Sequence, residues 1–154
     1  MSQKPANDHH YPRLAYVLIT IMLMMPVVLW PAPIFIYDNP MLADILTPTW
    51  LLCSTFLLLS AVIIDSMLYG MDSLKKSIDA TLWISLFAMF AISAVQNQGG
   101  SWLLAMLFLL HALRSGLRLC WQKNTAHMWW LWLSWSRDTA AALTLLAWSS
   151  LWQS

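Results

Sequence analysis

The stretch that decides the fold runs from residue 101 to residue 121 and reads SWLLAMLFLLHALRSGLRLCW. Its first half is almost entirely apolar, whereas its second half carries one histidine and two arginines. An apolar helix of about 20 residues is long enough to cross the hydrocarbon core of a bilayer. Charged groups on such a helix are costly in lipid, so we expect them to turn toward other polar groups inside a bundle.

The composition of the whole chain indicates the same environment. Hydrophobic residues make up 60% of the 154 residues, and charged residues make up only 10%. Soluble domains contain about 45–50% apolar and about 25% charged residues, and a small soluble fold could not bury this apolar excess. The 11 tryptophans also favour a membrane, because Trp concentrates at membrane interfaces. We therefore expect an all-α integral membrane protein surrounded by lipid, and the net charge of +1 gives no indication of a nucleic-acid partner.

The hydropathy pattern divides the chain into a polar tail and one transmembrane domain. The tail, residues 1–12, is expected to be a disordered cytoplasmic segment, and the domain covers residues 13–154. A cleaved signal peptide is the alternative for the first apolar run, but no small-residue cleavage site follows that run. The domain is predicted to be a compact bundle of about five transmembrane helices. The expected spans are residues 14–34, 49–68, 79–95, 101–119 and 128–152.

Prolines indicate where two of these spans bend or begin. Pro26 should kink the first span, because proline removes one helical hydrogen bond. Asn39 and Pro40 are typical of a helix N-cap followed by the first helical residue. We expect a short surface helix over residues 41–46, inside a loop of residues 38–48 that precedes the second span.

The distribution of basic residues predicts the direction of threading. The two loops on one side of the predicted bundle, residues 38–48 and 96–100, contain neither lysine nor arginine. Cytoplasmic segments of membrane proteins are enriched in these residues, so the other side is expected to be cytoplasmic. This places the N-terminus in the cytoplasm and the C-terminus outside, in the periplasm of a bacterial inner (plasma) membrane. The basic residues on the expected cytoplasmic side are Lys4, Arg13, Lys75, Lys76, Arg118 and Lys123.

Ionisable residues inside the spans form the candidate site. His111, Arg114 and Arg118 share one face of their helix, because a helix turns about 100° per residue. Asp65 is expected at a similar depth, and Asp138 is the predicted partner of Arg114. Adjacent residues diverge on a helix, so Arg137 and Asp138 are expected to point to different faces. The candidate ligand- or proton-binding residues are Asp65, His111, Arg114, Arg118, Arg137 and Asp138.

Two interpretations of this cluster stay open. With Asp79 included, three aspartates balance three arginines and leave His111 as the titratable remainder. The charges could simply pair and fix the helix register. Alternatively, a polar pocket facing the cytoplasm could bind an anion, a lipid head group, a quinone or a proton.

No cofactor or metal is predicted. Haem ligation by two histidines would need a second histidine facing His111, and no other histidine lies well inside a span. The adjacent pair His9 and His10 offers too few ligands for a metal site. Haem and quinone remain the cofactors that the bundle could most readily accommodate.

The functional prediction follows from the short loops, which leave no room for a soluble catalytic domain. We expect a non-enzymatic subunit or an accessory or assembly factor of a larger membrane complex, without catalytic residues. Its partners would be other membrane protein subunits or further copies of the chain. The alternatives are a small-solute or proton transporter, a quinone- or anion-binding membrane protein, and a haem-binding redox subunit.

Overall fold

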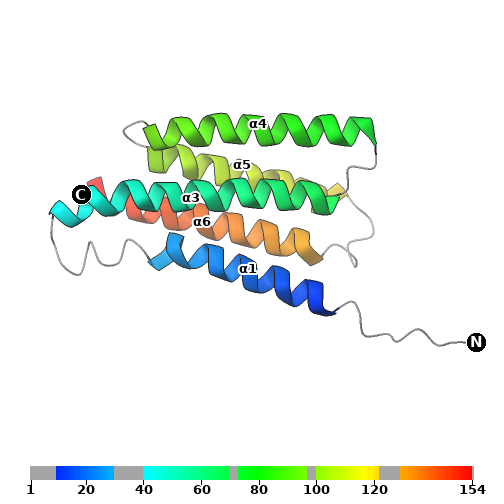
Figure 1. The fold of residues 1–154 in the computed structure, drawn as a ribbon, viewed down its shortest axis with the longest axis horizontal. Coiled ribbons are helices and arrows are strands. Elements are labelled where there is room, and N and C mark those ends of the chain that lie inside the picture. Colours follow the sequence, from blue (N-terminus) through cyan, green and yellow to red (C-terminus); the bar gives the residue numbers. More distant parts are fainter. Residues whose placement is uncertain (1–9, 30–39, 70–72, 97–99, 122–128, 154) are drawn as a thin grey trace, which may run out of the picture.

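A computed structural model of the protein describes residues 10–29, 40–69, 73–96, 100–121 and 129–153. These residues form helices and contain no strand, which confirms the prediction of an all-helical chain for the described part. The helices run side by side along one common axis (Figure 1). They are α1 (His10–Leu29), α3 (Pro40–Tyr69), α4 (Leu74–Gln96), α5 (Gly100–Trp121) and α6 (Trp129–Gln153).

Three helical segments are long and apolar enough to cross a membrane. They are Leu46–Leu68 of α3, Leu74–Gln96 of α4 and Gly100–Trp121 of α5. The apolar part of α1, Leu14–Leu29, is shorter. The helix α6 has 25 residues but carries charged residues in its first half. The structure thus supports a membrane protein with three candidate spans, and five crossings in the expected direction stay a prediction.

Two expected helix boundaries were wrong. The helix α3 is continuous from Pro40 through Pro48, so there is no separate surface helix before the second span. A proline inside a helix removes one hydrogen bond and bends the helix more readily than it ends a long apolar segment. The helix α4 begins at Leu74 rather than at residue 79, and the Ser73 hydroxyl caps it by accepting a hydrogen bond from the Lys76 backbone N–H at 3.3 Å.

The other boundaries differ less from the predictions. The helix α5 extends two residues beyond the expected span, and α6 is shifted by one residue. Residues 10–12, which were expected in the disordered tail, belong to α1. The rest of that tail, residues 1–9, and the end of the first predicted span, residues 30–34, lie outside the described residues.

The main apolar core fills the half of the bundle in which α4 ends and α5 begins. The helices α5 and α6 pack most extensively on each other. Ala141 and Ala142 of α6 are fully buried in this core, and such small residues allow helix backbones to approach closely. Gly100 serves a similar purpose at the start of α5, because a Cβ there would overlap the backbone carbonyl of Ala94. Large members of this core include Leu58, Val62, Phe87, Leu104, Phe108 and Leu145.

A buried hydrogen bond joins the end of α1 to α3. Trp50 is fully buried, and its indole N–H donates to the Val27 carbonyl at 2.9 Å. Val27 lies in the last turn of α1, where backbone carbonyls have no partner within the helix. Trp50 therefore supplies a buried hydrogen-bond donor to a carbonyl at the end of α1.

We expect Trp50→Phe to lower the free energy of unfolding by about 1–3 kcal/mol, because the Val27 carbonyl loses its donor. The measurement is reversible unfolding of the detergent-solubilised protein, followed by circular dichroism. Trp102→Phe is the matched control, since Trp102 is 45% exposed and should tolerate the change. Equal stabilities of the two variants would contradict this role of Trp50.

A buried polar cluster as candidate functional site

Polar side chains from α1, α3, α5 and α6 meet inside the bundle. They lie between the main apolar core and a smaller apolar group around Trp130 and Leu131. Each is nearly inaccessible, with exposed fractions of 9% for Tyr16, 6% for Arg137 and 3% or less for the others. We call this set the buried cluster, and its members are Tyr16, Asp65, His111, Ser115, Ser134, Arg137 and Asp138.

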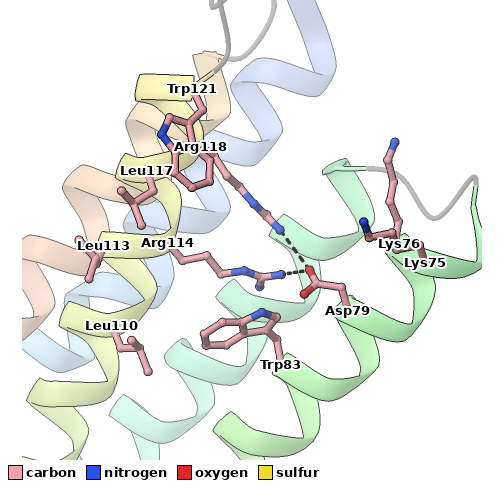
Figure 2. A pocket seen from close by; sticks show the side chains of 10 residues that line it. All are labelled: Lys75, Lys76, Asp79, Trp83, Leu110, Leu113, Arg114, Leu117, Arg118 and Trp121. Atoms are coloured by element: carbon pink, nitrogen blue, oxygen red, sulfur yellow. Dashed lines mark hydrogen bonds and ion pairs between the residues drawn. The ribbon is translucent and has the colours of Figure 1, made fainter.

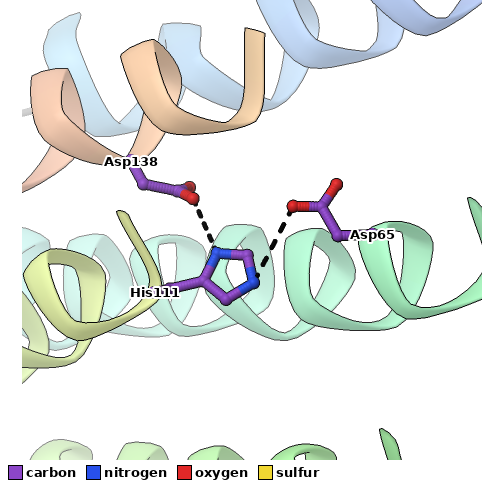
Figure 3. A group of neighbouring side chains, drawn as sticks. All are labelled: Asp65, His111 and Asp138. Carbon is purple, nitrogen blue, oxygen red and sulfur yellow. Dashed lines mark hydrogen bonds and ion pairs between the residues drawn. The ribbon is translucent and has the colours of Figure 1, made fainter. Parts of the chain in front are cut away.

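His111 occupies the middle of the buried cluster, between two carboxylates. Its Nδ1 lies 2.6 Å from Oδ2 of Asp138, and its Nε2 lies 3.8 Å from Oδ2 of Asp65 (Figure 3). The rings of His111 and of Phe87 on α4 pack at nearly a right angle, with their centroids 5.6 Å apart. The short contact with Asp138 is typical of a charge-assisted hydrogen bond. His111 therefore links α5 directly to α6 and electrostatically to α3.

Arg137 is the only guanidinium among the members of the buried cluster. Its Nε donates to Oδ1 of Asp138 at 2.9 Å, and its Nη2 lies 3.2 Å from the other oxygen of the same carboxylate. The same Nη2 lies 3.4 Å from Oδ2 of Asp65. The expectation that Arg137 and Asp138 serve different faces was wrong. The long arginine side chain reaches back across the 100° that separates adjacent residues on a helix.

Two hydroxyl groups complete the hydrogen bonding of Asp65. The Tyr16 hydroxyl donates to Oδ1 at 3.0 Å, and the Ser134 hydroxyl donates to Oδ2. The Tyr16 oxygen also accepts a hydrogen bond from Arg137 Nη1 at 3.3 Å. Neither Tyr16 nor Ser134 was predicted as a site residue. Ser134 could have been found, because it lies four residues before Asp138 and so shares its helix face.

The structure places the other two predicted residues outside the buried cluster. Arg114 Nη2 donates to Oδ2 of Asp79 at 2.7 Å, and Arg118 Nη2 lies 3.6 Å from the same oxygen. The predicted pairing of Arg114 with Asp138 was wrong. Three residues turn a helix by about 300°, so Arg114 points about 60° away from His111 and toward α4. The six candidates thus divide into a buried group of four and a pair of arginines at the α4–α5 surface.

The formal charges of the buried cluster do not balance when His111 is neutral. Asp65 and Asp138 carry two negative charges, and Arg137 carries one positive charge. An uncompensated charge in the interior costs several kcal/mol, and one additional proton would remove it. His111 is the group that would carry this proton, with its Nδ1 2.6 Å from Oδ2 of Asp138.

A metal ion fits the same atoms less well. Asp65, His111 and Asp138 each offer a ligand atom, and these atoms lie within 4.8 Å of one another. However, Arg137 already donates to both carboxylates. A divalent cation would compete with this guanidinium and leave the cluster with one positive charge in excess. Charge balance therefore favours a proton over a divalent metal.

We expect Arg137→Gln to destabilise the protein by about 3–5 kcal/mol, because it leaves the buried carboxylates of Asp65 and Asp138 without their guanidinium partner. The double variant Arg137→Gln with Asp138→Asn should lose less stability than the sum of the single losses. Asp79→Asn is the control, because the Asp79 side chain is 52% exposed and should cost about 1 kcal/mol or less. Strict additivity in this unfolding cycle would show that Arg137 and Asp138 do not depend on each other.

Comparisons with known protein families, with curated proteins and with solved structures found no match to this chain. Its function is therefore inferred from the geometry of the buried cluster and of the surface around it.

Proposed function

We propose that this chain is a multi-pass protein of a bacterial inner membrane whose buried cluster takes up and releases one proton. The observation that carries the proposal is the position of His111 between Asp65 and Asp138 in the bundle interior, at 1% exposure. Ionisable groups at membrane depth are expensive, and they commonly mark proton relays or ligand sites.

The chemistry of the cluster supports a proton as the ligand. Arg137 keeps its charge at any physiological pH, so it cannot take part in proton exchange. Histidine is the side chain whose charge most readily changes near neutral pH. A proton bound between His111 and Asp138 neutralises the cluster without displacing any of its hydrogen bonds.

Two hydroxyl groups form the side of the buried cluster that faces one end of the bundle. The Ser115 and Ser134 oxygens are 3.4 Å apart, and Ser134 donates to Asp65. Ser115 lies one turn beyond His111 on α5, toward the end that is predicted to face the cytoplasm. Beyond these hydroxyls the small apolar group around Trp130 and Leu131 lies between the cluster and that end, whereas the much larger main apolar core fills the opposite direction. This arrangement favours proton exchange with one side of the membrane during a proton-coupled step, rather than an open proton channel.

The alternatives from the sequence have less support from the geometry. Haem ligation would require His111 to release a carboxylate partner, since its Nδ1 bonds to Asp138 and its Nε2 faces Asp65. The role of a non-enzymatic subunit in a larger complex stays a prediction, and so do its partners.

If the buried cluster only fixes helix register, replacing His111 should reduce protein abundance. If the cluster exchanges a proton, a neutral replacement that keeps hydrogen bonding should preserve abundance and abolish proton binding.

The test is nitrogen-15 NMR of the labelled protein in lipid bilayers. Replacing His9, His10 and His127 by Asn leaves His111 as the only histidine. We expect its ring nitrogens to change from imidazolium to neutral imidazole between mildly acidic and mildly alkaline pH, while the helices remain folded. Asp138→Asn should alter this titration, whereas Asp79→Asn should affect it far less. One unchanging protonation state of His111 throughout this pH range would rule the proposal out.

A further inference from the structure

A cavity of about 460 Å³ opens between α4 and α5, at the end of the bundle where α4 begins and α5 ends (Figure 2). It shares no lining residue with the buried cluster. We call it the cationic groove. Its lining residues are Lys75, Lys76, Asp79, Trp83, Leu110, Leu113, Arg114, Leu117, Arg118 and Trp121.

The groove has a charged part and an apolar part. Two lysines of α4 and two arginines of α5 contribute four positive charges, and Asp79 is the only carboxylate among the described lining residues. The excess of three positive charges favours an anionic occupant. Leu113, Leu110 and Met106 follow each other at helical spacing from the groove toward the middle of α5, and their exposed fractions are 58%, 38% and 58%. They form an apolar strip that begins beside Arg114 and leads away from the end of the bundle that carries the four positive charges (Figure 2).

The two arginines are held in place within the groove. Asp79 accepts a hydrogen bond from Arg114 and lies close to Arg118. The Arg114 guanidinium also lies over the Trp83 ring, 4.6 Å from its centroid. Such cation–π contact orients a guanidinium without neutralising it. One carboxylate between two guanidinium groups leaves a net positive charge at a fixed position.

We propose that the cationic groove binds an acidic phospholipid, with its phosphate at Arg114, Arg118 and the two lysines and an acyl chain along the apolar strip. Guanidinium groups bind phosphate oxygens well, because their N–H donors match the spacing of those oxygens. The apolar strip favours a lipid over a soluble anion. A zwitterionic lipid is disfavoured, because Asp79 is engaged with both arginines and would have to leave them to pair with an ammonium group. The predicted threading places the groove at the cytoplasmic surface, where acidic lipids attract basic residues.

The test is native mass spectrometry of the protein released from detergent after incubation with phosphatidylglycerol or phosphatidylcholine. The variant Arg114→Gln/Arg118→Gln should bind phosphatidylglycerol about thirtyfold more weakly, since each basic residue near a membrane surface contributes about a fivefold factor. Trp102→Phe, at the opposite end of α5, should bind like the wild type. Phosphatidylcholine should bind much more weakly than phosphatidylglycerol to the wild type.

Two further binding measurements distinguish an acidic lipid from a soluble anion and test the groove with a second variant. Asp79→Asn should bind phosphatidylglycerol about fivefold more tightly, which tests the groove even if the double variant does not fold. Millimolar inorganic phosphate should not displace the lipid, and its displacement by phosphate would assign the groove to a soluble anion instead. Equal binding of the two lipids, or undiminished phosphatidylglycerol binding by a folded double variant, would overturn the proposal.

Discussion

The short contact between His111 and Asp138 is the interaction on which the interior of this bundle depends. It joins α5 to α6 at 2.6 Å, where neither side chain is accessible to solvent. Through Arg137 and Ser134 the same carboxylate is connected to Asp65 of α3 and to Tyr16 of α1. Four helices thus share one polar network, in a region where an unpaired charge would cost several kcal/mol. The apolar core positions these helices, and the network specifies their register.

Most charged residues of the described helices lie in two sites of opposite sign. The buried cluster has one negative charge in excess when His111 is neutral, whereas the cationic groove has three positive charges in excess. Arg114 belongs to the groove but follows His111 by only three residues on the same helix. Protonation inside the bundle and lipid binding at its surface would therefore act on neighbouring turns of α5. The two proposals remain independent, because the sites share no residue.

Much of the fold could be predicted from periodicity and composition. The helices α5 and α6 agree with their predicted spans to within two residues, because an apolar run with polar flanks is a strong signal. The continuous α3 was missed, since Pro48 indicated a boundary although a long helix can accommodate one proline. The early start of α4 was missed because Lys75 and Lys76 suggested a loop, whereas Ser73 caps the helix before them.

The residues that form the candidate site were predicted better than the pairs that they form. Four predicted residues do come together, because charged side chains in apolar helices are stabilised by other polar groups inside the bundle. They are Asp65, His111, Arg137 and Asp138. The partner of Arg114 could not be predicted, since the sequence does not say whether α4 or α6 lies beside that face of α5. Tyr16 gave no signal, because a single tyrosine in an apolar helix is equally typical of a membrane interface.

The central claim is that the bundle interior binds one exchangeable proton. Its most direct test is to count the protons taken up by purified protein in lipid nanodiscs when the pH falls from mildly alkaline to mildly acidic, using a soluble pH indicator dye. We expect His111→Gln to take up one proton fewer per protein than the wild type, at unchanged helical content. Equal proton uptake by the two proteins would contradict the claim.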